Sequence, residues 1–206
     1  MDRRKKTKVV KDWLGTGSIN IFGAPFAGKD TQGHRLAAEL DAPLLGGGDI
    51  LRGSTMPDHI KKLMRTGKLI PTNDYHEIVL PYFKQKKFEG KPLVLSSVGR
   101  WHGEEAGVLE ATSESGHPLK AVIYLKISEE TVWQRWEQAD SRRSRGKRAD
   151  DTYEALQVRL AEFRDKTLPA IDFYGSQNLL VEIDSEQDTD IVTEEILDSL
   201  IRFAGL

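Results

Sequence analysis

The chain has 206 residues, which is enough for one sizeable hydrophobic core and for one or two domains. Its 30 basic and 32 acidic residues nearly cancel, so the net charge of −2 gives no general attraction to nucleic acid. No apolar run approaches the roughly 18 residues that span a membrane. The chain has no cysteine, which excludes disulfides, thiolate zinc sites and a cysteine nucleophile.

Residues 1–12 are strongly charged and are predicted to form a solvated arm, with attachment to nucleic acid as the alternative. They do not form a secretory signal, because the apolar pair Val9 and Val10 is followed at once by Lys11 and Asp12. We therefore expect a cytoplasmic protein.

From residue 18 onwards, short apolar runs alternate with segments of helical periodicity. The apolar runs fit strands buried on both faces of a parallel sheet, and they lie at 18–22, 92–95, 121–125 and 179–183. The helical segments lie at 31–40, 104–114, 129–138, 153–165 and 188–203. A further helical segment at 75–88 contains Pro81, which should kink or divide it. Strands that alternate with helices predict an α/β fold with right-handed crossovers.

A glycine-rich segment follows the first predicted strand and precedes the first predicted helix. It reads Gly23-Ala24-Pro25-Phe26-Ala27-Gly28-Lys29, with the spacing G-x-x-x-x-G-K of a phosphate-binding loop. Glycines let several backbone N–H groups converge on one anion, the helix N-terminus adds positive charge, and Lys29 would reach the terminal phosphates. The segment predicts a nucleotide phosphate site, with a purely structural glycine turn as the alternative. We assign to this site Gly23, Ala24, Pro25, Ala27, Gly28, Lys29, Asp30 and Thr31.

Asp30 departs from the strict motif, which has serine or threonine directly after the lysine. A carboxylate at about 5 Å from a phosphate charge costs about 3 kcal/mol at an effective dielectric constant of about 20. A magnesium ion between them would replace this repulsion with coordination. Asp30 is therefore either part of a metal shell or points away to cap the helix, and both interpretations stay open.

The segment 23–32 resembles the first motif of the adenylate kinase family of nucleoside monophosphate kinases. Other segments resemble later motifs of that family: Gly48-Asp49-Ile50-Leu51-Arg52, Gly67-Lys68-Leu69-Ile70-Pro71, Arg148-Ala149-Asp150-Asp151, Arg159-Leu160, and Pro169 followed by Phe173-Tyr174. The family's order and spacing hold from residue 19 to residue 206. Several weak motifs in the right order are far more specific than any one of them.

The resemblance implies an α/β fold of the three-layer P-loop NTPase type with a five-stranded parallel sheet. Within a domain at 13–206, it implies a small helical insert at about 47–90 that binds the nucleoside monophosphate (NMP), and a short lid at about 139–151. The dense basic run at 142–148 fits a lid that closes over phosphates. A zinc-bearing lid is excluded, because the chain has no cysteine. The family is often monomeric, and we expect a monomer without membrane or nucleic-acid partners.

The resemblance also implies the reaction, ATP + AMP = 2 ADP, which depends on Mg²⁺ and has ATP and an NMP as partners. Phosphoryl transfer needs aligned phosphates, excluded water and neutralised negative charge. The planar fork of arginine suits this task. Besides Lys29, the catalytic residues by family position are Arg100, Arg135, Arg148 and Arg159. Arg52 and Arg100 map to the acceptor phosphate, Arg135 and Arg148 to the donor phosphates, and Arg159 lies between the two. The acceptor site further includes Gly47, Ile70 and Glu104.

Ser96 stands where the family usually has an aspartate that helps to hold the water shell of magnesium. A serine hydroxyl could still bond a metal-bound water, but it brings no charge. We hypothesise that Asp30 supplies the missing carboxylate, so that Asp30 and Ser96 form the metal site, directly or through water. The alternative is weakened or lost catalysis.

Glu104 stands where the family's adenylate kinases have a glutamine that reads adenine, and Gly47 replaces a threonine. An ionised glutamate accepts hydrogen bonds but donates none. It could take the amino group of adenine, but it suits the N–H groups of guanine or the amino group of cytosine at least as well. AMP is the favoured acceptor, with CMP, UMP, dCMP and GMP left open.

Two other functions compete with a nucleoside monophosphate kinase. One is an inactive nucleotide-binding protein of the same fold, which the lost strand-end aspartate and the altered acceptor pocket would favour. The other is a P-loop kinase that acts on a metabolite other than a nucleotide. The segments 48–52 and 148–151 argue against the second, because they suit nucleotide phosphates.

Overall fold

The computed structural model describes residues 1–47, 50, 56–60, 72–142 and 152–206. Three residues that the sequence assigned to the site, Arg52, Ile70 and Arg148, lie outside the described residues. Much of the predicted NMP-binding insert at 47–90 and most of the predicted lid at 139–151 also lie outside them. The insert and the lid therefore stay predictions.

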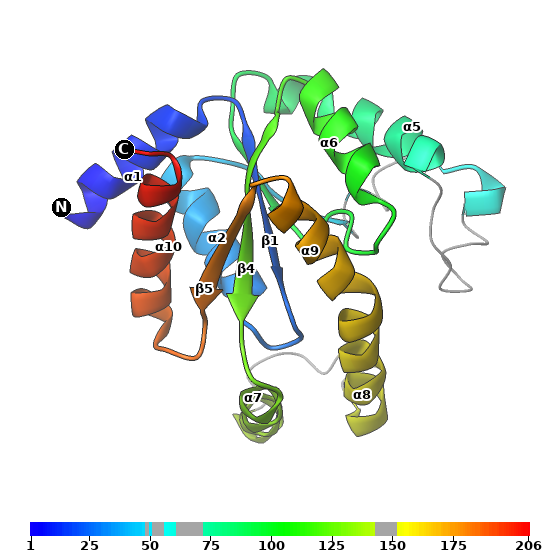
Figure 1. Ribbon diagram of the computed structural model, residues 1–206, viewed down its shortest axis with the longest axis vertical. Coiled ribbons are helices and arrows are strands. Elements are labelled where there is room, and N and C mark those ends of the chain that lie inside the picture. The colour runs from blue at the N-terminus through cyan, green and yellow to red at the C-terminus, as the bar shows by residue number, and fades with distance from the viewer. Residues whose placement is uncertain (48–49, 51–55, 61–71, 143–151) are drawn as a thin grey trace.

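The fold is built on one sheet of five parallel strands in the order β2-β3-β1-β4-β5 (Figure 1). The strands are β1 (Ser18–Gly23), β2 (Leu44–Gly46), β3 (Leu93–Ser96), β4 (Leu119–Lys126) and β5 (Leu180–Asp184). β1 is buried along its whole length, because it lies in the middle of the sheet and both faces of the sheet are covered. The five-stranded parallel sheet is confirmed. The short strand β2 was not predicted, because three residues are too few to show a periodicity.

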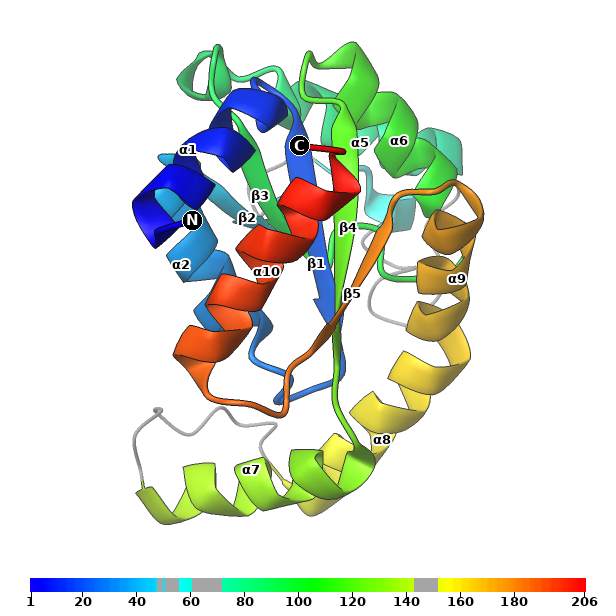
Figure 2. The same ribbon diagram turned by 60° about the vertical axis from the view of Figure 1, so that its left-hand side comes forward.

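Helices cover both faces of this sheet, which gives three layers (Figures 1 and 2). One face carries α1 (Arg3–Leu14), α2 (Lys29–Leu40) and α10 (Thr189–Phe203), which share one apolar core with the strands. The other face carries α5 (Thr72–Phe83), α6 (Glu105–Glu114) and α9 (Leu168–Ser176), which share a second core. The predicted three-layer α/β architecture is confirmed. None of the described helices is long and apolar enough to cross a membrane.

The helical segment predicted at 75–88 is divided, as the proline in it suggested. Helix α5 contains Pro81 and ends at Phe83, and a short 3₁₀ helix, Lys86–Phe88, follows it. Proline lacks the N–H group that would bond the carbonyl four residues before it, which weakens the last turns of this helix.

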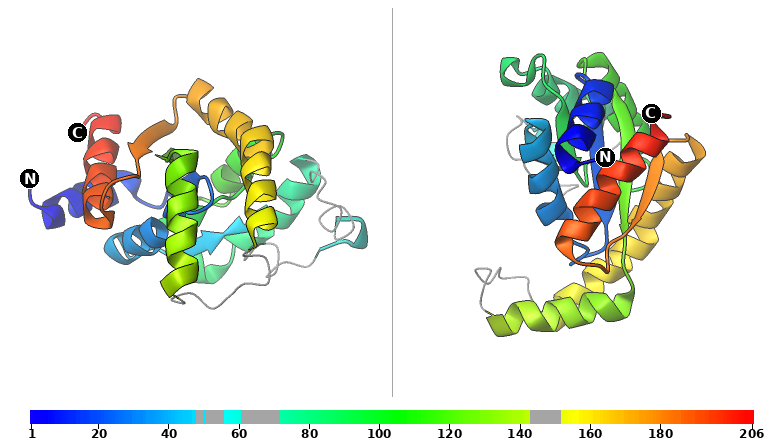
Figure 3. Two further views of the ribbon diagram at one scale, coloured as in Figure 1. Left: turned by 90° about the horizontal axis from the view of Figure 1, so that it is seen from below. Right: turned by 90° about the vertical axis from the view of Figure 1, so that its left-hand side faces the viewer.

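Two helices lie beyond the carboxyl ends of the strands, α7 (Glu129–Arg142) and α8 (Tyr153–Glu162) (Figures 1 and 3). The N-terminus of α7 is capped as a serine before an acidic first turn predicts, since the Ser128 hydroxyl accepts the Thr131 N–H at 3.2 Å. The rings of Trp133 and Tyr153 stack 4.7 Å apart and join the two helices. A π-helical turn, Phe163–Thr167, connects α8 to α9. A third small core lies here, formed by the buried side chains of Ala24, Val132, Leu156 and Leu160.

The N-terminal segment corrects the prediction of a solvated arm at 1–12. It forms helix α1, in which Val10 and Leu14 are buried against the sheet layer. Lys6 lies one turn before Val10 on the same side of the helix, and its Nζ pairs with Glu194 at 3.0 Å and Asp198 at 2.8 Å. Part of this segment's charge is paired with distant helices, since Arg3 pairs with Glu39 on α2 and Lys6 with carboxylates on α10, and no local pattern shows such partners.

Candidate active site

The glycine-rich segment 23–28 forms a tight loop between β1 and α2 at the carboxyl end of the sheet. Gly28 has φ of 90°, a conformation that favours glycine. A Cβ atom at Gly23 would meet the Ala27 Cβ atom and the Leu125 carbonyl at 3.0 Å, so this position also requires glycine. The strand, loop and helix therefore have the arrangement that a phosphate cradle needs, with the N-terminus of α2 facing the loop.

Lys29, the first residue of α2, folds back over this loop. Its Nζ donates hydrogen bonds to the carbonyl oxygens of Gly23 and Ala24, both at 2.8 Å. Burial lowers the pKa of Lys29 to about 8, although the Asp30 carboxylate favours the charged form. A bound polyphosphate would restore the full charge of this ammonium group, because it would add negative charge beside it.

Two arginines from different elements act on Lys29. The positive charges of Arg159, on α8, and of Arg100, in the loop after β3, both lower the pKa of Lys29. The carboxyl ends of parallel strands meet at one edge of a sheet, which is why residues that follow β1, β3 and β4 converge here. Three cations that gather beside a glycine-rich loop and the N-terminus of a helix indicate a site for an anion of several charges.

Arg135 on α7 bridges the phosphate loop and the connection between β5 and α10. Its Nη1 donates to the Phe26 carbonyl at 3.1 Å, and its Nη2 donates to the Ser185 carbonyl at 2.6 Å. Arg135 therefore lies beside the loop on its α7 side, and its role toward the donor stays a prediction.

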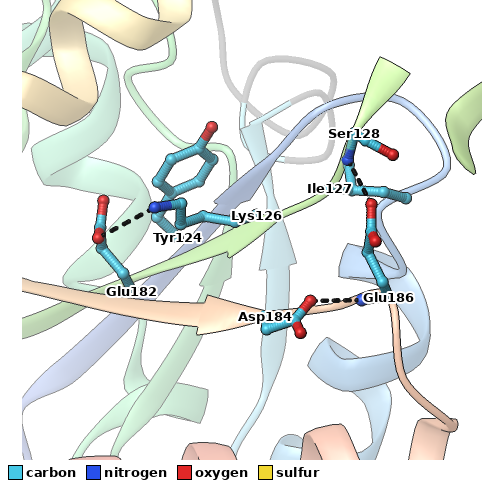
Figure 4. Close-up of a pocket in the computed structure, with 7 residues that line it drawn as sticks. All are labelled: Tyr124, Lys126, Ile127, Ser128, Glu182, Asp184 and Glu186. Carbon is cyan, nitrogen blue, oxygen red and sulfur yellow. Dashed lines mark hydrogen bonds and ion pairs between the residues drawn. The ribbon is translucent and has the colours of Figure 1, made fainter. Parts of the chain in front are cut away.

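Glu186 holds the start of α7 in place next to this bridge (Figure 4). Its carboxylate accepts the Ser128 N–H at 2.7 Å and the Thr131 hydroxyl at 3.1 Å. These hydrogen bonds lower the pKa of Glu186 below its usual value. Thr131 and Arg135 are four residues apart, so they lie on one face of α7, and that face is fixed at both points.

The pocket in Figure 4 is not the phosphate site. It is open, has a volume of about 510 Å³, and is lined by Tyr124, Lys126, Ile127, Ser128, Glu182, Asp184 and Glu186. Three carboxylates face a single lysine, and that lysine pairs with Glu182 at 3.4 Å. This charge would repel a polyphosphate, whereas the loop around Lys29 would attract one.

The two residues predicted for the metal site lie on neighbouring elements. Asp30 is exposed in the first turn of α2, and Ser96 is the last residue of β3. Within the described parts of the chain, no group of three or more His, Cys, Asp or Glu side chains could hold a metal ion. A donor set of one carboxylate and one hydroxyl suits Mg²⁺ that keeps several waters and is held mainly by substrate phosphates.

Two consecutive buried carboxyl groups lie at the start of α6, where the sequence analysis predicts the acceptor site. Glu104 is only 6% exposed, and its Oε2 accepts the Trp101 N–H at 3.3 Å. Glu105 is 3% exposed and accepts the Gly103 N–H at 2.6 Å, and it pairs with His102 Nδ1 at 2.8 Å. The loop that carries Arg100 is thus folded around two buried carboxyl groups.

Two residues, Asn20 and Gly47, lie against the backbone of the loop that carries Arg100. Asn20, in the middle of β1, donates from Nδ2 to the Val98 carbonyl at 2.7 Å and accepts the Val98 N–H at 3.3 Å. Sequence reasoning missed Asn20, although a lone amide within an apolar strand was a signal for a buried hydrogen-bond partner. A Cβ atom at Gly47 would meet the Ser97 carbonyl at 2.9 Å, which explains why a threonine does not fit there.

The family model described as adenylate kinase matches residues 21–179 of the chain, from the phosphate loop to beyond α9. The chain belongs to the adenylate kinase family. An adenylate kinase of Agrobacterium fabrum is 33% identical over 184 residues, covering 85% of this chain and 93% of that protein. One of Salinispora tropica is 28% identical over 217 residues, covering 90% and 98%. A uridylate kinase of Schizosaccharomyces pombe is 30% identical over 189 residues, covering 88% and 96%.

Membership of the adenylate kinase family makes the chain a phosphotransferase, a nucleoside monophosphate kinase. This confirms the family that the ordered motifs indicated. The structure brings Lys29, Arg100 and Arg159 together around the phosphate loop and places Arg135 beside it. The roles of the individual residues are part of the proposal below.

Proposed function

We propose that the chain transfers the γ-phosphoryl group of ATP·Mg²⁺ reversibly to AMP. The observation that carries the proposal is the phosphate loop with Lys29 folded over it and the charges of Arg100 and Arg159 acting on Lys29. The test is whether the protein forms ADP from ATP and AMP, and whether this activity is lost when Lys29 is replaced. The cytoplasmic location and the monomeric state stay predictions.

The phosphate loop and the basic side chains have separate roles in the transfer. The N–H groups of the loop and Lys29 bind the donor phosphates, and Arg135 with Arg148 neutralises the charge on that side. Arg52 and Arg100 hold the acceptor phosphate, and Arg159 stabilises the charge that spreads between the two phosphates. The acceptor phosphate is already an anion, so no side chain has to remove a proton from it.

Asp30 and Ser96 would hold the waters around the magnesium ion. The ion would supply positive charge between the donor phosphate oxygens, which lowers the repulsion that an incoming phosphate meets. Asp30 provides the negative charge of the site, because the strand-end residue Ser96 has none.

Replacing Asp30 with asparagine is expected to raise the Mg²⁺ concentration needed for half-maximal rate about tenfold, the usual effect of a lost outer-shell ligand. The measurement is the initial rate as a function of Mg²⁺ at fixed ATP. Asp41→Asn is the matched control, since Asp41 lies at the other end of α2. Unchanged turnover and unchanged Mg²⁺ dependence in Asp30→Asn would show that Asp30 does not serve the metal.

The identity of the acceptor base depends on Glu104. Its buried carboxylate lies four residues after Arg100 and accepts hydrogen bonds from its surroundings. An ionised carboxylate accepts a hydrogen bond from the amino group of adenine but donates none to the ring nitrogen beside it. AMP is the proposed acceptor, and UMP or CMP is the second candidate, supported by the similarity to the fission-yeast uridylate kinase.

Replacing Glu104 with glutamine is expected to change the ratio of kcat/KM for AMP to that for CMP, UMP and GMP by about tenfold, the worth of one charged hydrogen bond. The direction favours AMP, because the amide can both donate and accept. Glu110→Gln, at an exposed position of α6, is the control and should leave the acceptor profile unchanged. An acceptor profile like that of the wild type in Glu104→Gln would refute the role of Glu104.

A further inference from the structure

Phe26 occupies an unusual backbone conformation at the tip of the phosphate loop. Its φ is 62°, in the left-handed region that favours glycine. The other described non-glycine residues with positive φ are Asp41, Ser97 and Asn178, which are small and polar. A bulky aromatic residue keeps such a conformation only where its surroundings hold it there. The contacts of Phe26 therefore have to outweigh the strain.

Both the backbone and the side chain of Phe26 are held by the two helices beyond the strands. The carbonyl oxygen accepts the hydrogen bond from Arg135 on α7 at 3.1 Å. The half-buried ring packs against the third core, which is formed by Ala24, Val132, Leu156 and Leu160. Val132 lies on α7, and both leucines lie on α8.

These two helices carry Arg135, which is proposed for the donor side, and Arg159, which is proposed to act between donor and acceptor. Arg135 lies three residues after Val132, and Arg159 lies between Leu156 and Leu160 on the side of α8 that faces the loop. The cradle of N–H groups needs no aromatic side chain at the tip of the loop, because backbone groups bind the phosphates. The ring of Phe26 thus connects the loop with the helices that bring Arg135 and Arg159 to it.

We propose that Phe26 is a positioning residue for the donor nucleotide: its ring holds α7 and α8 against the phosphate loop, so that Arg135 and Arg159 are aligned before ATP binds. The proposal rests on the proposed function, because it assumes that ATP occupies the loop. Loss of the ring should therefore weaken the binding of ATP and leave the binding of AMP unchanged.

The test compares ATP affinity in three Phe26 variants by calorimetric titration with ATP·Mg²⁺. Phe26→Asn and Phe26→Gly both suit a positive φ but remove the ring, and each should weaken ATP binding about tenfold, or 1.4 kcal/mol. Phe26→Leu keeps an apolar side chain and should regain most of the affinity. Asn178→Gly, at an exposed position with φ of 55°, controls for the release of backbone strain and should bind ATP like the wild type.

Affinity for AMP, titrated in the same way, should stay within about twofold of the wild type in all variants. Wild-type ATP affinity in folded Phe26→Asn and Phe26→Gly, with only a lower melting temperature, would overturn the proposal and leave the ring as core packing alone. Equal losses for ATP and AMP would also overturn it. The titration does not require turnover, so a chain that binds ATP without transferring phosphate would contradict the proposed function and still test Phe26.

Discussion

Replacing Lys29 with alanine is expected to lower kcat/KM for phosphoryl transfer about a thousandfold, the upper range for removal of one preorganised donor to developing charge. Lys29 is already placed over the loop by hydrogen bonds to two loop carbonyls, so little reorganisation precedes its contact with phosphate. Its desolvated site makes the ammonium group more effective toward an anion than it would be in water. The measurement is ADP formation in a coupled assay.

The fold should survive this substitution. The lowered pKa of Lys29 means that the folded state disfavours the charged amine at pH 7. The stability of the wild type should rise between the folded pKa, about 8, and the unfolded value of 10.5, because only the unfolded chain holds the proton there. The stability of Lys29→Ala should not show this increase with pH, and its circular dichroism spectrum should match that of the wild type. Lys29→Met, which retains the aliphatic stem, should lose activity equally. Substantial activity in Lys29→Met would show that phosphoryl transfer does not depend on the positive charge of Lys29.

Replacing Arg159 with methionine should lower kcat about a hundredfold, because its guanidinium stabilises charge that develops only during transfer. Arg159 is half-buried near Lys29, and its neighbours Leu156 and Leu160 fix the helix face that carries it. The loss should fall on kcat more than on the KM of either substrate, since the group binds the transition state more tightly than the ground state.

Arg164→Met is the matched control for this loss. Arg164 lies one turn further along, is half-exposed, and pairs with Glu129 at 2.9 Å rather than acting on Lys29. It should retain nearly wild-type kinetics. A loss in Arg159→Met that appears only as a higher KM for ATP would assign Arg159 to ground-state binding of the donor instead.

The strands and most of the helices were predictable because their patterns are local. Four strands contain short apolar runs, although β5 alternates buried and exposed residues, and the phosphate loop has glycines where φ or close packing favours them. Helix α1 was not predictable in this way. Lys6 pairs with carboxylates of α10, and no local pattern shows which distant charges a helix will meet.

The phosphate loop and the position of Lys29 over it were predictable from motif spacing, since the loop and Lys29 are adjacent in sequence. The supporting residues were not. Asn20 acts through a hydrogen-bonded pair with Val98, and Phe26 acts through helices that follow it by more than a hundred residues. Contacts of this kind depend on the order of strands in the sheet, which the residues themselves do not reveal.

The most direct test of the account is an ADP-release assay with ATP and Mg²⁺ against AMP, CMP, UMP, GMP and their deoxy forms, run beside Lys29→Ala. We expect a rate with AMP that exceeds the rates with the other acceptors and that disappears in Lys29→Ala, which also excludes a contaminating kinase. No Lys29-dependent rate with any NMP, from protein that still binds ATP, would contradict it.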